Sequence, residues 1–138
     1  MMRYLAIDLG QKRTGLAIGD DETRVVTPLA VIEQARQELL LQRVVDWLER
    51  EQIDAVVVGL PLNMDGTRGQ SARRAEKFAI ELGRRTSRPV HLTDERLSST
   101  VADAQMAQSG LTHGQKRLRR DALAAATILR DFLEGLKQ

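Results

Sequence analysis

Residues 54–61, "DAVVVGLP", decide the fold of this 138-residue chain. Their apolar run is short and continuous, which is typical of a strand that is buried on both faces within a parallel sheet. Helix-like patterns precede and follow this run, so the sequence predicts an α/β protein in which this strand lies inside the sheet.

Apolar residues that recur at helical spacing predict the helices of the chain. Between the central strand and the helix after it, residues 62–69, "LNMDGTRG", have the Asn, Asp and Gly content of a loop. Ser98 or Ser99 is the expected N-cap of a shorter helix that Gly110 ends. The predicted helices cover about residues 35–51, 70–86, 98–108 and 115–136.

Three β-like runs lie before the first helix and another lies between the second and third helices. The first three are so close together that they predict antiparallel hairpins or a meander. Pro28 places the third run at a sheet edge or splits it there. The order βββαβαβαα predicts a five-stranded mixed sheet with helices on both faces, in a single domain over residues 1–138. The runs are residues 3–10, 13–20, 24–33 and 88–95.

The composition excludes several functions. The chain has no cysteine, which excludes disulfides, thiol nucleophiles and cysteine-based zinc sites. Its four aromatic residues are too few for a base-stacking platform. No apolar run approaches the roughly 20 residues of a membrane helix, and the N-terminus reads as a strand rather than a signal peptide. We therefore expect a cytoplasmic protein without a membrane partner.

Charge is distributed unevenly along the chain. Residues 1–62 hold 7 Lys and Arg against 10 Asp and Glu, whereas residues 63–138 hold 14 against 9. A basic second half is compatible with binding to a polyanion, and equally with solvated helix faces. Candidate phosphate contacts are Lys12, Arg13, Arg68, Arg73, Arg74, Arg96, Lys116, Arg117, Arg119 and Arg120.

Carboxylates from three distant parts of the chain are expected at one edge of the sheet. If the first, fourth and fifth strands are parallel neighbours, their carboxyl ends meet there. Asp8 lies near the end of the first strand, and Asp94 and Glu95 follow the fifth. Asp121 borders the apolar stripe of the last helix, about 40° around from Ala125. Ion pairing with the preceding "KRLRR" is the alternative explanation for Asp121.

Asp8, Glu95 and Asp121 would repel one another at a single point unless a divalent cation neutralised them. Oxygen ligands without His or Cys favour Mg²⁺ or Mn²⁺ over zinc. Such a cluster suits phosphodiester hydrolysis, with one or two metal ions. The sequence leaves open whether Asp94 joins the cluster.

The remaining polar candidates have structural explanations. His91 lies on a strand and His113 in the loop "GLTHGQK", and neither has a neighbour that suggests a catalytic triad. Ser98, Ser99 and Thr100 are better explained as helix-cap residues than as nucleophiles.

Four blocks of the chain resemble the YqgF family, also called RuvX. They are "AIDLGQKRTGLAIGD" at 6–20, "VVGLPLNMDGTRG" at 57–69, "TDERLSS" at 93–99 and "DALAAATIL" at 121–129. The resemblance implies an RNase H-like fold and a bacterial cytoplasmic nuclease that processes the 5′ end of pre-16S rRNA. It also implies that Asp8, Glu95 and Asp121 are the catalytic acidic residues. Two small departures, Gly19 where many relatives have Ser and "LSST" where "LST" is frequent, touch no carboxylate.

Three other functions remain open at this point. An older proposal for the family is Holliday-junction resolution, which uses the same site but needs a dimer. A non-catalytic RNA-binding factor of ribosome assembly would gain nothing from three anions that face phosphate. The first block also resembles the phosphate loop of the actin and sugar-kinase fold, but those proteins pair two such domains. The expected partners are pre-16S rRNA or branched DNA, with the ribosome or its assembly factors, and the chain is expected as a monomer or homodimer.

Overall fold

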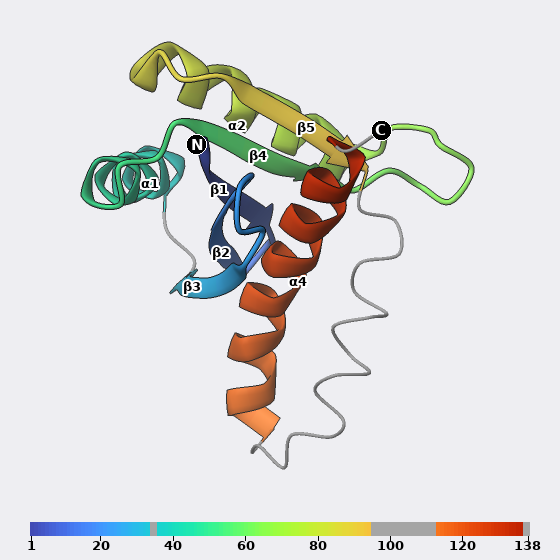
Figure 1. Cartoon of the computed structure of the whole chain (residues 1–138). Coiled ribbons are helices and arrows are strands. Elements are labelled where there is room, and N and C mark those ends of the chain that lie inside the picture. Colours follow the sequence, from blue (N-terminus) through green and yellow to red (C-terminus); the bar gives the residue numbers. More distant parts are fainter. Residues whose placement is uncertain (34–35, 95–112, 137–138) are drawn as a thin grey trace.

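The computed structural model of the chain describes residues 1–33, 36–94 and 113–136, and in the last helix the side chains from Ala122 onward. Within this part of the chain there are five strands and three helices (Figure 1). The strands are β1 (Arg3–Leu9), β2 (Arg13–Asp20), β3 (Val26–Glu33), β4 (Ala55–Leu60) and β5 (Val90–Asp94). The helices are α1 (Gln37–Arg50), α2 (Gln70–Thr86) and α4 (His113–Gly135).

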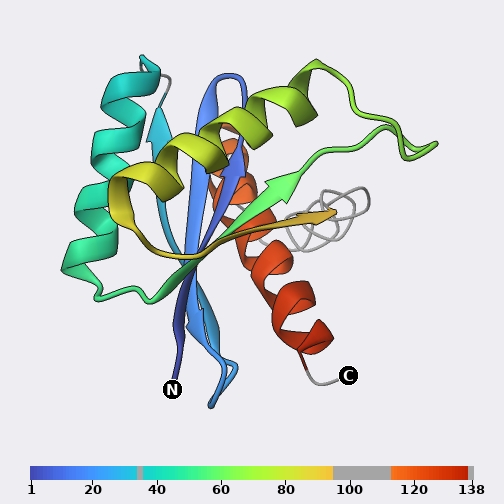
Figure 2. The same cartoon turned by 90° about the horizontal axis from the view of Figure 1, so that it is seen from above.

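The strands form one sheet in the order β3-β2-β1-β4-β5. β1 is antiparallel to β2 and parallel to β4, and β4 is parallel to β5. α1 and α2 cover one face of the sheet and α4 covers the other, as the two views show (Figures 1 and 2). The predicted mixed sheet with helices on both faces is confirmed, and β1, β4 and β5 are the parallel neighbours that the sequence indicated.

β4 occupies the inner position that its apolar run predicted. Ala55 through Gly59 are all buried, because neighbouring strands flank β4 on both sides and helices cover both faces. β3 lies at the edge, as Pro28 indicated. Its pairing with β2 shifts between Leu16 and Ala17, which pair with Ala30 and Pro28, so β3 is bulged there and is not split.

Side chains of β1 alternate between two hydrophobic cores. Leu5 and Ile7 belong to the core beneath α1 and α2, and Tyr4 and Ala6 belong to the core beneath α4. The helices bury the stripes that the sequence predicted. Their buried residues include Leu41, Val44 and Leu48 of α1, Ala75, Phe78, Ala79 and Leu82 of α2, and Ala122, Ala125, Leu129 and Leu133 of α4.

The helix bounds agree with the predicted segments to within two residues, and α2 agrees at both ends. The placement of His113 in a loop was wrong, because α4 begins at this residue. Gly114 made the segment read as a loop, but a glycine in the first turn of a helix is tolerated and sequence patterns locate helix ends only to within a few residues. The helix expected at about 98–108 lies outside the described residues.

The helices that the structure describes include no candidate membrane span. None of them has the length and apolar character needed to cross a bilayer.

Candidate active site

Asp8 lies near the carboxyl end of β1, half-buried, with its side chain on the α4 face of the sheet. The alternation along β1 determines this face, because Tyr4 and Ala6 also lie in the core beneath α4. Asp8 pairs with Gly15 of β2. Continuing the β1–β4 register by one residue from Ile7 and Val58 brings Gly59 level with Asp8 on the other side. On both neighbouring strands, the residue level with Asp8 is therefore a glycine.

α4 crosses this face in the direction opposite to β1 (Figure 2). Near the beginning of β1, the Tyr4 ring meets the Phe132 ring with 5.4 Å between centroids. From Tyr4 to Asp8 the strand advances about 13 Å. From Phe132 back to residue 121 the helix retreats about 16 Å, and these eleven residue steps turn it to within about 20° of the same direction. The backbone of residue 121 therefore lies close to the level of Asp8, on the sheet side of α4.

Asp94 is on the opposite face from Asp8. It pairs with Leu60, whereas His91 pairs with Val57 on the α4 side. The His91 ring confirms this side, since its centroid lies 5.2 Å from that of Phe132. Successive strand residues alternate, so Asp94, three residues after His91, points towards the α2 side. The question that the sequence left open is answered for Asp94, while Glu95 and the Asp121 side chain lie outside the described residues.

No three Asp, Glu or His side chains come together as a possible metal site among the side chains that the structure describes. Asp8 is one of these described side chains, but its two predicted partners are not. The grouping of Asp8 with Glu95 and Asp121 therefore stays a prediction.

The turn between β1 and β2 is held in place by α2. Arg74 donates a hydrogen bond from Nη1 to the Gly10 carbonyl oxygen at 2.7 Å. Gly10 in turn donates its backbone N–H to the Arg13 carbonyl oxygen at 3.0 Å. A Cβ atom at Gly10 would lie 2.3 Å from that oxygen, so only glycine fits this turn. Sequence reasoning missed the Arg74 contact, which links α2 to a turn two residues beyond Asp8.

The other predicted phosphate contacts that the structure describes lie in this turn and β2, in the loop after β4, and on α2. Lys12 is exposed at the tip of the turn, and Arg13 lies 3.9 Å from Glu33. Arg68 lies 3.3 Å from Glu76, and the Arg68 side chain is largely exposed. Arg73 is exposed next to Arg74. The side chains of Arg96, Lys116, Arg117, Arg119 and Arg120 lie outside the described residues.

The tyrosine beneath α4 is not an acid or base at neutral pH. Burial, together with the negative charges of Asp21 and Asp54, raises the pKa of Tyr4 above its ordinary value of 10.0. Of the ionisable groups described on this face, Asp8 is the one placed at the carboxyl end of a parallel strand beside two glycines.

Comparisons with known proteins agree with this arrangement. A relative from Anaeromyxobacter sp. (strain Fw109-5), named "Putative pre-16S rRNA nuclease", is 46% identical over 97% of this chain and 98% of its own. Thermus thermophilus RuvC in complex with a Holliday junction has a TM-score of 0.62 at 17% identity, over 99% of this chain and 96% of that one. The Fowlpox virus resolvase in its junction complex has a TM-score of 0.63 at 13% identity, over 99% and 100%.

These two structures show the fold, which is that of the RuvC-like, RNase H-like resolvases. The model of one family, described as "RuvX: Holliday junction resolvase", matches residues 2–135. With a match over nearly its whole length and a relative at 46% identity, the chain belongs to the RuvX family.

Proposed function

We propose that this protein is a divalent-metal-dependent endonuclease that cleaves structured RNA, with the 5′ end of pre-16S rRNA as its substrate in the cytoplasm. The observation that carries the proposal is the position of Asp8, half-buried between two glycines at the carboxyl end of β1. Members of the family have nuclease names, and the nuclease role extends to this chain on that basis.

Mg²⁺ or Mn²⁺ fits the donors available to this site. Asp8 offers carboxylate oxygens, and no cysteine exists in the chain to draw a softer metal. We propose Glu95 and Asp121 as the other two ligands. The position of Glu95 in the sequence supports it, because this residue follows β5 directly, and β5 ends at the same edge of the sheet as β1. The helical phase of α4 supports Asp121. A divalent cation in such a site lowers the pKa of a water molecule and stabilises the leaving oxygen of the phosphodiester.

The chain itself would bind and orient the substrate. Lys12, at the tip of the turn that follows Asp8, is placed to hold a phosphate group. Gly15 and Gly59 leave space beside the carboxylate for the backbone of the nucleic acid. Arg13, Arg68, Arg73, Arg96, Lys116, Arg117 and Arg120 are proposed as further phosphate contacts, which position a nucleic acid without reading its sequence.

Holliday-junction resolution is the second candidate, since the family description names that activity. The two activities differ in substrate and assembly, because a junction resolvase must cut two opposed strands and therefore acts as a dimer. Purified protein should be assayed on a precursor 16S rRNA fragment and on a four-way DNA junction, with Mg²⁺, Mn²⁺ or EDTA. We expect cleavage of the RNA that EDTA abolishes. Cleavage of the junction alone, by a protein of dimeric mass, would replace the RNA assignment.

The carboxylates provide the test with the largest effect. Asp8→Asn removes the metal-binding charge, so we expect cleavage to fall at least about 100-fold with an unchanged unfolding temperature. Glu95→Gln and Asp121→Asn should do the same. Asp94→Asn is the matched control, because Asp94 points to the other face, and it should keep activity within about threefold. Retained RNA binding with wild-type cleavage in two of the three site variants would contradict the nuclease assignment.

A further inference from the structure

One line of α2 side chains faces away from the sheet. Arg73, Lys77, Ile80 and Arg84 recur at helical spacing, and all four are exposed. Ile80, with 58% of its surface exposed, is flanked by the basic residues. We call these four residues the α2 ridge.

The helix that carries the ridge is basic, although the neighbouring helix α1 is not. α2 contains five Lys and Arg against two Asp and Glu, whereas α1 contains two against three. The two helices lie side by side on the same face of the sheet (Figures 1 and 2). Solvent exposure alone would favour charges of either sign on both helices, so the excess on α2 needs another cause.

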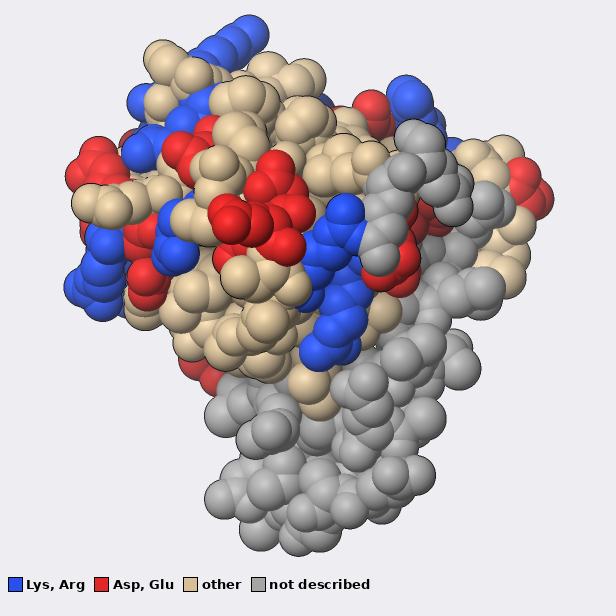
Figure 3. All heavy atoms as spheres, in the orientation of Figure 1, with Lys and Arg blue, Asp and Glu red and all other residues tan. Residues whose placement is uncertain are grey.

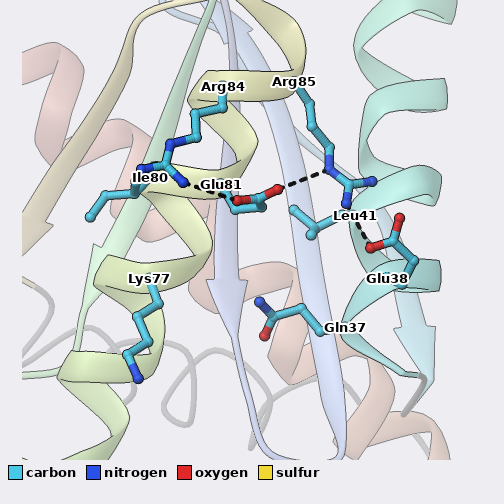
Figure 4. A pocket seen from close by; sticks show the side chains of 8 residues that line it. All are labelled: Gln37, Glu38, Leu41, Lys77, Ile80, Glu81, Arg84 and Arg85. Carbon is cyan, nitrogen blue, oxygen red and sulfur yellow. Dashed lines mark hydrogen bonds and ion pairs between the residues drawn. The ribbon is translucent and has the colours of Figure 1, made fainter.

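Within the described residues, three of the five cations of α2 have an ion-pair or hydrogen-bond partner, and two do not. Arg85 joins α2 to α1, with Nη2 2.6 Å from Glu38 Oε2 and Nε 3.5 Å from Glu81 Oε1. Arg84 lies 3.7 Å from Glu81. Lys77 lines the pocket between α1 and α2, and its side chain points away from these ion pairs (Figure 4). Neither the Lys77 nor the Arg73 side chain has a hydrogen bond or ion pair with the described residues.

Arg73 does not stabilise α2 through the helix dipole. The first turn of α2 contains no acidic residue, and Arg73 and Arg74 follow immediately after it. Positive charge near a helix N-terminus opposes the helix dipole, which costs some stability. A polyanion bound along this side of the helix would remove that cost.

The ridge begins beside the candidate active site. Arg74, the neighbour of Arg73, contacts Gly10, two residues beyond Asp8. From Arg73 to Arg84 the helix then advances about 16 Å away from that edge. This length matches about five base pairs of a nucleic acid duplex.

The face seen in Figure 3 carries groups of Asp and Glu beside its groups of Lys and Arg. Stacking of unpaired bases is also excluded for the ridge, because none of its four residues is aromatic. Its chemistry therefore suits contact with a phosphate backbone.

We propose that the α2 ridge binds the phosphate backbone of the RNA duplex that flanks the cleavage site, with Arg73 and Lys77 as its principal contacts. This inference rests on the proposed function, and it adds the direction in which the bound RNA duplex extends from the site. The duplex runs from the Asp8 edge along the outer surface of α2.

The test is the salt dependence of RNA binding. Each phosphate contact contributes about 0.9 to the slope of log K against log salt concentration. Binding of an RNA duplex of about 20 base pairs, measured in EDTA over a range of KCl concentrations, should lose about two units of slope in the Arg73→Gln/Lys77→Gln variant. Arg43→Gln/Arg50→Gln on α1 is the charge-matched control, and it should keep the wild-type slope. Ile80→Ser, which keeps the charge of the ridge, should also keep it.

The proposal that the α2 ridge binds RNA would be contradicted by an unchanged slope in the Arg73→Gln/Lys77→Gln variant. An equal loss of slope in the α1 control would also contradict it. So would a loss of binding in Ile80→Ser alone, because that result would indicate an apolar protein contact. Cleavage of precursor rRNA by the wild type is measured separately in Mg²⁺. Its absence would contradict the proposed function and leave the slope comparison readable.

Discussion

The two faces of the sheet are built from side chains of different size. Beneath α1 and α2 the core consists mainly of Leu, Ile, Val and Phe, with Phe78 fully buried and with Ala75 and Ala79 as its alanines. Beneath α4 the core is rich in alanine, from Ala6, Ala17 and Ala55 of the sheet to Ala125 and Ala126 of the helix. The face with the small residues is the one that carries Asp8.

Side-chain size determines how near a helix backbone comes to a sheet. Large aliphatic groups bury much apolar surface and supply most of the hydrophobic free energy, at roughly 25 cal/mol per Å². Alanines bury less but let α4 approach closely the face of the sheet that carries Asp8. We infer that the α1/α2 face mainly stabilises the protein and that the α4 face positions the active site.

The largest expected effect on stability lies on the α1/α2 face. Phe78→Ala leaves a cavity in the large-residue core and should lower the free energy of unfolding by about 3–5 kcal/mol. Urea unfolding measures this change. Because Phe78 is remote from the α4 face, activity per folded molecule should stay near that of the wild type, and a loss of activity beyond the unfolded fraction would break the comparison.

A pair of alanine-to-leucine changes sharpens the comparison. Ala125→Leu beneath α4 and Ala79→Leu beneath α2 both overpack a buried site, each at a cost of about 1–3 kcal/mol. Leucine and alanine have similar helix propensities, so packing dominates the effect. Only Ala125→Leu should reduce cleavage by the folded protein, because it displaces α4 from Asp8. Equal activity in the two variants would show that the α4 face does not position the site.

Arg74 links α2 to the β1–β2 turn, two residues beyond Asp8. Arg74→Gln should weaken the bond to the Gly10 carbonyl and lower the free energy of unfolding by about 1 kcal/mol. Arg73→Gln is the adjacent control, and it should not lower the unfolding temperature, because it removes a positive charge near the N-terminus of α2. Identical unfolding temperatures for Arg74→Gln and the wild type would mean that α2 does not brace the turn.

The smallest effect concerns Asp131 on α4. Partial burial raises the pKa of this carboxyl above its ordinary value of 3.8, so the folded protein holds the proton more tightly than the unfolded chain does. The charged form therefore costs stability above the raised pKa, and the cost disappears as the pH falls below 3.8. Asp131→Asn should raise the unfolding temperature at pH 7 by less than about 2 °C. A gain that grows as the pH falls would contradict this assignment.

Much of the fold was predictable because its signals are local. The continuous apolar run of β4 indicated an inner strand, and the stripe of α2 located that helix at both ends. Pro28 indicated the edge strand, because proline lacks the N–H that a central strand needs. His113 was assigned wrongly, since a glycine near a helix end is compatible with both a loop and a first turn.

The candidate site was predictable as residue types and less so as geometry. The sequence proposed Asp8 as a ligand and left Asp94 undecided, because the face of a carboxylate depends on the strand register. Register arises from pairing between distant segments, which a one-dimensional pattern does not contain. The Arg74 contact is of the same kind, since it joins residues 64 positions apart.

The sequence by itself determined the number and order of the strands, the stripes of the described helices, the absence of thiol chemistry and the acidic residues available for a metal. These features follow from periodicity and composition, which act along the chain. Only the tertiary structure decided that Asp8 lies between two glycines beneath α4, that Asp94 faces the other way and that the basic line of α2 begins beside the site. Those relations depend on which strands pair, and on which side of the sheet each helix packs.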